Sequence, residues 1–401
     1  MPASPGLPPL SRYLDASATA PPADEVLAAM QAAAGSAWAN PSSLHGWGLS
    51  AAELLERSRL RLAQAMGADP RQLVLCSGGS EAIHLGLLGS AARLPPGRLL
   101  LSAVEHPATE AAASQLARQG WQLQRLPVDQ LGRLDPAVLA GWLEPPTRMV
   151  SIIWGQNEVG TLQPIEAIGR LCREAGVLLH VDAVQVLGHL SIDLARLPVD
   201  LLSVAAHKLQ GPRGIGALLL AEGVQVDALI GGGGQEGGRR GGTEPAMLAH
   251  GFATALELAS ARLAANGGVD PLKERRDALW QRLQNHRGLR LSGADPLQPG
   301  ARLPHHLSLL VADAEGRPLP GRGLVRALAR RGWALSSGSA CSQGGGGERP
   351  SPVLLAMGYD PAEAASGLRI SLGPWVTHEA LGSFPDALAE ACAELATATA
   401  F

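Results

Sequence analysis

Short apolar segments alternate along the chain with longer segments in which apolar residues recur every three to four positions. The apolar segments are "QLVLCS", "RLLLSA", "RMVSIIW", "GVLLHVDAV" and "DLLSVAA", and the segments between them include "TEAAASQLARQ" and "IEAIGRLCREA". The apolar segments are too continuous for strands with one face in solvent, and this is typical of a parallel sheet covered on both faces. The pattern therefore predicts an α/β fold with a mostly parallel sheet between helices.

The pattern changes near a long helical segment over residues 245–265. Beyond it the alternation becomes sparser, and two later apolar segments, "HLSLLVA" and "LRISLG", predict a smaller α+β unit. A chain of 401 residues also exceeds what one hydrophobic core usually organises. We therefore predict a large α/β domain over 16–258 and a small α+β domain formed by 1–15 and 259–401.

Charge and hydropathy narrow the class of partner. The formal net charge is -3, from 33 basic and 36 acidic residues, so no overall basic field is available for nucleic acid or an anionic membrane. No stretch of about 20 apolar residues is present, and the start "MPASPGLPPLSRYLD" lacks the basic and apolar regions of a signal peptide. The sequence predicts a cytoplasmic chain with a small-molecule or protein partner, and with neither nucleic acid nor membrane as partner.

The four cysteines are far apart and form no C-x-x-C pair, which argues against a structural zinc site or a disulfide framework. Cys76 and Cys172 lie in apolar or helical segments and are expected to be buried and inert. Cys341 differs, because its segment "SSGSACSQGGGGERPSPV" is too rich in glycine and small residues to pack as a core. We expect a reactive thiol on a mobile segment.

Polar residues directly follow the five apolar segments. Ligands of open α/β sheets bind at the carboxyl ends of the strands, so these residues are expected to share one site. In "SGGSEA", Ser80 is placed to cap a helix and to present backbone N–H groups to an anion. The other residues in these positions are His106 in "EHPA", Asn157 in "QNEVG", Asp182 in "DAVQ", and His207 and Lys208 in "HKLQG".

Each of these residues alone has an ordinary structural explanation: a helix cap, a surface histidine, a turn asparagine, an ion-paired aspartate and a surface lysine. Together they match what pyridoxal phosphate requires. Its aldehyde forms a Schiff base with a lysine, its phosphate favours a helix N-terminus, and an aspartate keeps its ring nitrogen protonated. The set therefore predicts a pyridoxal-phosphate site.

Ten motifs resemble, in order, those of the cysteine desulfurases, pyridoxal-phosphate enzymes of the class V aminotransferase type that supply sulfur for iron-sulfur clusters. They are "YLDASATAPP", "NPSSLHGWG", "SGGSEA", "EHPA", "QNEVGTLQPI", "HVDAVQVLGHLSID", "HKLQGPRGIG", "GGGGQEGGRRGGTE", "SSGSACS" and "RISLG". The resemblance runs from Tyr13 to about Gly373 and is weak over 261–304 and 312–332. The long cysteine segment resembles the iron-sulfur-assembly branch. The resemblance implies fold type I of the pyridoxal-phosphate enzymes, with a sheet of the seven-stranded type in the large domain.

The resemblance also implies how the cofactor is held. Lys208 would be the Schiff-base lysine, Asp182 would pair with the pyridine nitrogen, and His106 would stack on the ring. The remaining cofactor-binding residues would be Asn157 and Gln185 near the phenolic oxygen, and Gly79, Ser80 and His207 at the phosphate.

Substrate and partner follow from the same resemblance. Asn40 and Arg369, with Asn157 beside them, would bind L-cysteine; a guanidinium gives a carboxylate two parallel hydrogen bonds. Thr243 would reach the phosphate of the neighbouring subunit's cofactor, which implies a homodimer with shared sites. Cys341 would take the sulfur as a persulfide, release alanine, and pass the sulfur to an acceptor or iron-sulfur scaffold protein. No resident metal is implied, although Cys341 could transiently ligate an iron-sulfur cluster.

Five residues depart from the family pattern. Ala205 stands where a phosphate-binding serine is usual, Ser80 where a threonine is usual, Gln156 where an asparagine is usual, and Ile83-His84 where polar residues are usual. One lost hydrogen bond to a charged group costs about 1.5–3 kcal/mol, enough to weaken cofactor affinity and too little to abolish it.

Other functions fit parts of the sequence. A cysteine or cystine C–S lyase, a selenocysteine lyase or an amino-acid epimerase would use the same scaffold, but lyases and epimerases need no nucleophilic thiol such as Cys341. An RNA-binding role for "GGRRGG" is disfavoured by the net charge and by the shortness of the motif. An inactive scaffold is disfavoured because Lys208 and Cys341 are both present.

Overall fold

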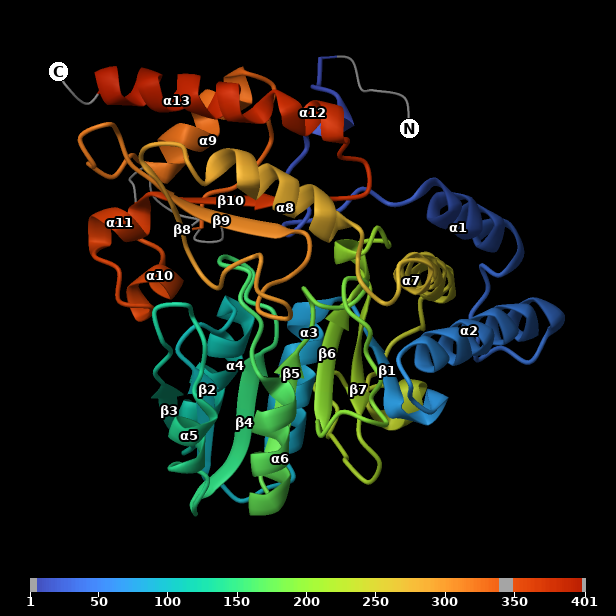
Figure 1. Ribbon diagram of the computed structural model, residues 1–401. Coiled ribbons are helices and arrows are strands. Elements are labelled where there is room, and N and C mark those ends of the chain that lie inside the picture. Colours follow the sequence, from blue (N-terminus) through green and yellow to red (C-terminus); the bar gives the residue numbers. More distant parts are fainter. Residues whose placement is uncertain (1–5, 339–348, 399–401) are drawn as a thin grey trace.

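The computed structural model describes residues 6–338 and 349–398. A large α/β layer carries a smaller α+β layer over one edge of its sheet (Figure 1). The predicted fold class is confirmed: the main sheet has seven strands in the order β1-β7-β6-β5-β4-β2-β3, and β7 is antiparallel to both of its neighbours. Its strands are β1 (Leu73–Cys76), β2 (Arg98–Ser102), β3 (Gln122–Leu126), β4 (Thr147–Ile153), β5 (Leu178–Asp182), β6 (Leu201–Ala205) and β7 (Gly216–Leu220).

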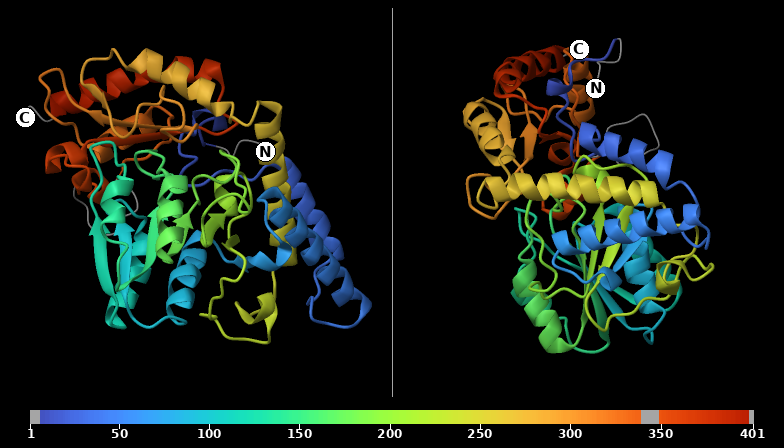
Figure 2. Two further views of the ribbon diagram at one scale, coloured as in Figure 1. Left: turned by 60° about the horizontal axis from the view of Figure 1, so that its bottom comes forward. Right: turned by 90° about the vertical axis from the view of Figure 1, so that its right-hand side faces the viewer.

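Side chains of the main sheet alternate between two helix layers. On β2, Leu99 and Leu101 join a cluster with α3 and α4, whereas Leu100 between them belongs to the cluster on the other face. This period of two is the geometry of a strand buried on both faces. Figures 1 and 2 show α6 on one face and α3 and α4 on the other. The helices of the large α/β layer are α1 (Asp24–Ser36), α2 (Gly46–Ala65), α3 (Gly79–His84), α4 (Pro107–Arg118), α5 (Pro136–Ala140), α6 (Ile165–Ala175) and α7 (Ala246–Ala265), with the short helical segments η2 (Pro70–Gln72), η3 (Leu85–Gly89), η4 (Ala206–Lys208) and η5 (Gln235–Gly238). The short segment η1 (Leu10–Arg12) instead packs against the smaller layer, where Arg12 lies over the Trp333 ring.

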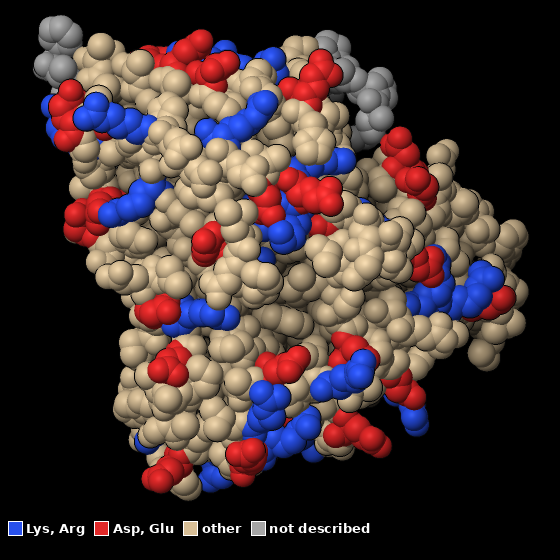
Figure 3. All heavy atoms as spheres, viewed as in Figure 1, with Lys and Arg blue, Asp and Glu red and all other residues tan. Residues whose placement is uncertain are grey.

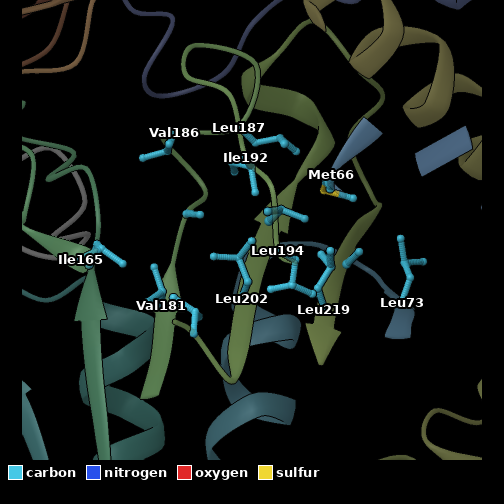
Figure 4. Packing of buried hydrophobic residues seen from close by; sticks show 14 of the residues in the cluster. Met66, Leu73, Ile165, Val181, Val186, Leu187, Ile192, Leu194, Leu202 and Leu219 are labelled. Carbon is cyan, nitrogen blue, oxygen red and sulfur yellow. The ribbon is translucent and has the colours of Figure 1, made fainter. Parts of the chain in front are cut away.

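The centre of the sheet is packed by residues in register across three strands. Leu202 on β6 pairs with Val181 on β5 and with Leu219 on β7, and all three are fully buried. Figure 4 shows these side chains with Leu194 and Ile192 from the segment between β5 and β6. This packing fixes the ends of β5 and β6, where Asp182 and Lys208 follow.

Replacement of Leu202 by alanine is expected to lower the free energy of unfolding by about 2–5 kcal/mol, because a fully buried leucine leaves a cavity that its neighbours fill only in part. Urea unfolding followed by circular dichroism measures this. Leu131→Ala is the control, since Leu131 is 42% exposed. Equal stability of the two variants would contradict the packing described.

The smaller layer has its own core. Its antiparallel sheet has the order β10-β9-β8, formed by β8 (Leu289–Leu291), β9 (His306–Val311) and β10 (Gly367–Ser371). Leu14 joins residues from 272 to 392 in one apolar cluster. The helices of this layer are α8 (Leu272–Leu283), α9 (Gly321–Arg330), α10 (Pro352–Ala356), α11 (Pro361–Ala365), α12 (His378–Gly382) and α13 (Phe384–Ala398). The division of the chain into 16–258 against 1–15 with 259–401 stays a prediction.

Two absences apply to the described ranges. No helix within 6–338 and 349–398 has both the length and the apolar character needed to cross a bilayer. The same residues contain no group of three or more histidine, cysteine, aspartate or glutamate side chains arranged to hold a metal ion.

Candidate active site

A cavity of about 360 Å³ lies where the parallel strands end and the smaller layer begins. Each of the five apolar segments singled out in the sequence, or the turn that follows it, supplies at least one residue to the wall of this cavity. This fits the rule that open α/β sheets bind ligands at the carboxyl ends of their strands. The lining residues are Asp15, Ser17, Ala18, Gly79, Ser80, Ile83, His106, Ile153, Asn157, Asp182, Val184, Gln185, His207, Lys208, Ser336 and Arg369.

Lys208 is the last residue of η4, directly after β6. Its Nζ donates hydrogen bonds to the carbonyl oxygens of Ser17 at 2.6 Å and Ala18 at 2.7 Å. These contacts direct the amine of a half-buried lysine toward the cavity instead of toward solvent. Lys208 therefore occupies the place expected of an amine that reacts with a bound carbonyl group.

Asp182 ends β5 and is 3% exposed. Its Oδ1 accepts a hydrogen bond from the Val184 N–H at 2.9 Å. Burial raises the pKa of Asp182, while His106, the Val184 N–H and Lys208 each act to lower it. A buried carboxylate that lines a cavity in this way is suited to bind a cationic group of a ligand, which would stabilise its charged form.

His106 is the N-cap of α4, and its Nδ1 accepts a hydrogen bond from the Ala108 N–H at 3.1 Å. Burial lowers the pKa of His106, although Asp182 opposes that effect. The cap contact fixes the imidazole on the wall of the cavity, where a flat ring can stack against a ligand. Pro107 at the first helical position supports this geometry.

The expected anion cradle differs from its prediction in one respect. Ser80 does not cap a helix: it is the second residue of α3, and Gly78 is the N-cap. Ser80 and Gly79 still line the cavity from the first turn of α3. A Cβ on Gly79 would lie 2.7 Å from Val184 Cγ2, so this close approach of backbone to the cavity wall requires glycine.

His207 lies beside the same cradle. Its Nδ1 is 3.2 Å from Thr19 Oγ1, and burial, with Lys208 and Arg213, lowers its pKa to about 4. A neutral imidazole of this kind can donate one hydrogen bond to a phosphate oxygen.

Three buried polar atoms around the cavity have no hydrogen-bond partner among the described residues: Asn157 Oδ1, Gln185 Oε1 and Arg369 Nε. Buried polar atoms are nearly always paired in folded proteins, so an unpaired set around one cavity is typical of a ligand site. A side-chain amide offers both donor and acceptor atoms, and a guanidinium offers donors to a carboxylate. These residues, with Asp182 and Lys208, fit pyridoxal phosphate and an amino-acid substrate.

Arg369 lies on β10 and is 4% exposed. Its Nη1 donates to the Asn157 carbonyl oxygen at 3.0 Å, and its Nη2 donates to Asp15 Oδ1 at 2.8 Å. The two bonds tie the smaller sheet to both the Asn157 turn and the N-terminal segment. Arg369 also lines the cavity, and its Nε has no hydrogen-bond partner among the described residues.

Two of the predicted residues that the structure describes are not brought to the cavity. Asn40 is exposed, with its Oδ1 accepting from the Ser42 N–H at 2.9 Å, and Thr243 is exposed beside the glycine-rich segment; neither lines the cavity of one chain. Cys341 lies outside the described residues. The roles of Asn40, Thr243 and Cys341 stay predictions.

Sequence reasoning assigned no role to several lining residues, of which Asp15 and Ser17 make polar contacts. Both belong to the motif "YLDASATAPP", where they alternate with the buried residues Leu14 and Ala16. The apolar lining residues Ile83, Ile153 and Val184 could not be separated from core residues by pattern.

The structure also accounts for one departure from the family pattern. Gln156 is fully buried: its Nε2 donates to the Val104 carbonyl oxygen, and its Oε1 accepts from Val159 N at 2.9 Å. Its amide therefore holds the turn that presents Asn157. Ala205 is fully buried at the end of β6, and Ile83 lines the cavity.

The other three cysteines are buried, as expected for Cys76 and Cys172. Burial raises the pKa of Cys172 to about 12 and that of Cys392 to about 11. Burial also raises the pKa of Cys76 far above its ordinary value. A thiol is nucleophilic as the thiolate, so none of these three is suited to attack a substrate at neutral pH.

Replacement of Asp182 by asparagine is expected to reduce turnover by roughly 10²- to 10³-fold with little loss of stability, because the isosteric amide keeps the Val184 contact but cannot hold a cationic ring nitrogen. Steady-state rates and thermal unfolding of the cofactor-loaded variant measure the two effects. The matched control is Asp200→Asn at the opposite edge of the sheet, where Asp200 Oδ2 accepts from Leu179 N at 2.7 Å. Near-normal turnover of Asp182→Asn would contradict the assigned role.

Comparisons with known proteins agree with the fold and the motifs. The family model described as aminotransferase class-V matches residues 12–384. A protein of Dictyoglomus turgidum named cysteine desulfurase IscS is 34% identical over 389 residues, which are 96% of this chain and 95% of that protein. A solved structure of a NifS-like protein has a TM-score of 0.84 at 30% identity, covering 96% of this chain and 99% of that one.

A second solved structure, of SspA in complex with cysteine, has a TM-score of 0.77 at 29% identity and covers 91% of this chain and 100% of that one. The family membership that the motifs predicted is thus confirmed. The chain belongs to the class-V aminotransferase family and, within it, to the cysteine desulfurases.

Proposed function

We propose that the protein is a pyridoxal-phosphate-dependent cysteine desulfurase, a transferase that moves the sulfur of L-cysteine to Cys341 and releases L-alanine. The observation that carries the proposal is the meeting of Lys208, Asp182 and the unpaired amide oxygens of Asn157 and Gln185 in one cavity. Membership of the family adds the substrate class, since relatives of similar length are named cysteine desulfurases.

The cofactor would be held from several sides. Gly79, Ser80 and His207 would bind its phosphate, and His106 would cover one face of its ring. Asp182 would pair with the ring nitrogen, while Asn157 and Gln185 would bond the phenolic side. When bound, pyridoxal phosphate supplies an electron sink for negative charge that develops on the substrate carbon.

The chain's own residues then perform the transfer. Arg369 and Asn157 orient the substrate carboxylate, with Asn40 as a further contact in the assembled protein. Lys208 moves a proton at the α-carbon of the substrate. The Cys341 thiolate forms a sulfur–sulfur bond as the substrate carbon–sulfur bond breaks; the electron pair of that bond stays with carbon, which takes a proton and leaves as alanine.

A homodimer would complete the site. The tip of the α1–α2 pair exposes Trp38 at 67%, Leu44 at 92% and Trp47 at 60%. Apolar side chains gathered in this way are typical of a surface that a partner covers. In the dimer, Thr243 of one subunit would reach the phosphate bound by the other.

The persulfide sulfur would pass to an acceptor protein for iron-sulfur cluster or other sulfur biosynthesis, in the cytoplasm. In Figure 3, acidic and basic side chains are interspersed over the visible face and no single sign dominates it. This mixture favours a protein acceptor over a nucleic acid as the partner of that face.

The test is product analysis with L-cysteine and a reductant. We expect stoichiometric alanine and sulfide. Pyruvate and ammonia would instead identify a C–S lyase, and a much faster reaction with selenocysteine than with cysteine would identify a selenocysteine lyase.

A further inference from the structure

Ser17 is bonded through each of its polar groups. Its N–H donates to Ser371 Oγ at 2.9 Å, and its carbonyl oxygen accepts from Lys208 Nζ at 2.6 Å and from Gln185 Nε2 at 2.9 Å. Its Oγ lies 3.3 Å from His305 Nε2, and the residue is 2% exposed. A residue outside regular secondary structure is therefore held between the smaller layer and the reactive lysine.

His305 is itself held by a buried cluster. Its ring stacks on that of His189, with centroids 3.6 Å apart and planes 16° from parallel. His189 Nδ1 lies 2.7 Å from Asp270 Oδ2, and Arg262 Nη2 lies 3.6 Å from the same oxygen. A carboxylate can only accept, so His189 carries a hydrogen on Nδ1. The Asp270 side chain is fully buried, so this pair fixes the ring on which His305 rests.

The direction of the bond to Ser17 follows from the surroundings of His305. Burial, then His189, His306, Arg276 and Arg262 lower the pKa of His305 well below its usual value, so the ring is neutral. Its Nδ1 has no partner among the described residues. Buried N–H groups without a partner are rarer than unpaired acceptors, so the hydrogen lies on Nε2 and is donated to Ser17 Oγ.

We propose that Ser17 is a positioning residue for Lys208 and that His305, supported by His189 and Asp270, fixes the conformation of Ser17. The carbonyl of Ser17 then holds the lysine amine whenever that amine is not bonded to cofactor. The inference rests on the proposed function for its meaning in catalysis, but its geometry can be tested without turnover.

The chain has only two lysines, Lys208 and Lys273, so labelling lysine Cε with ¹³C gives two signals, and Lys273→Arg identifies them. Their chemical shifts follow the protonation of each amine as pH is varied in the cofactor-free protein. In Ser17→Ala and in His305→Leu, we expect Lys208 to titrate about half a pH unit lower, because a weaker bond to carbonyl oxygen stabilises the charged amine less.

Three further variants separate positioning from simple loss of stability. The double variant Ser17→Ala/His305→Leu should match the single variants, since both act through one bond. In His305→Gln, Lys208 should titrate as in the wild type, because the glutamine amide keeps a hydrogen-bond donor near the position of His305 Nε2. His250→Leu on α7, outside the cavity wall, should leave it unchanged.

The inference is overturned if Lys208 titrates at the wild-type pH in folded Ser17→Ala, if the two single effects add in the double variant, or if His250→Leu produces the same change. Should His305→Leu fail to fold, Ser17→Ala carries the test alone. Failure of the proposed function is a separate result: products other than alanine would overturn that function while leaving the Lys208 titration to decide the role of Ser17.

Discussion

Replacement of Lys208 by alanine is expected to lower desulfurase turnover by about 10²- to 10⁴-fold, the contribution of one positioned acid or base. The effect should be larger still if covalent attachment of the cofactor is lost as well. The physical reason is the position of Lys208. Two carbonyl oxygens direct its amine into the cavity that Asp182 and His106 also line. Alanine release from L-cysteine measures the rate.

The control for this prediction is Lys273, the other lysine of the chain. Lys273 lies on α8, where its Nζ is 2.5 Å from Asp277 Oδ2 in a pair one helical turn apart. We expect Lys273→Ala to keep its turnover. After borohydride reduction, peptide mass spectrometry should find the cofactor on Lys208; finding it on Lys273 would contradict the site described.

Replacement of Cys341 by serine is expected to separate cofactor binding from sulfur transfer. None of the residues proposed to hold the cofactor is the Cys341 thiol, so absorbance of bound cofactor and its change on adding L-cysteine should persist. Alanine formation should fall by orders of magnitude, because a serine hydroxyl is almost fully protonated at neutral pH and attacks sulfur poorly.

The matched controls are Cys76→Ser, Cys172→Ser and Cys392→Ser. Their thiols are buried and have raised pKa values, so turnover per folded protein should stay near that of the wild type. Alanine release at the wild-type rate by Cys341→Ser would rule out the transfer step and favour a lyase.

The main-chain architecture was largely predictable because five strands are buried on both faces, and such strands have continuous apolar sequences. Two strands of the main sheet were not predicted: β7 is as apolar and as buried as these five, whereas β3 is not. β3 lies at the edge of the sheet and carries polar residues in the order "QLQRL", and β7 begins inside the glycine-rich turn after Lys208. The first residue of β7 is glycine because a Cβ at position 216 would lie 2.5 Å from the Val204 carbonyl oxygen.

The site was predictable as far as it is built from strand ends. Asp182 and Lys208 follow buried strands, and the sheet brings such positions together whatever the loops do. Asp15 and Ser17 reach the cavity from a segment near the N-terminus, and Ser336 reaches it from a segment after α9. Contacts over such sequence separations leave no periodic pattern. The sequence predicted Ser80 as a helix cap, but α3 begins at Gly79 and its N-cap is Gly78.

The measurement that tests the central claim most directly is mass spectrometry of the protein after a single turnover with L-cysteine. The sulfur transfer proposed here predicts one added sulfur atom on the peptide that carries Cys341, and one alanine released for each such peptide. An added sulfur on another cysteine, or alanine-free release of pyruvate with Cys341 unmodified, would contradict it.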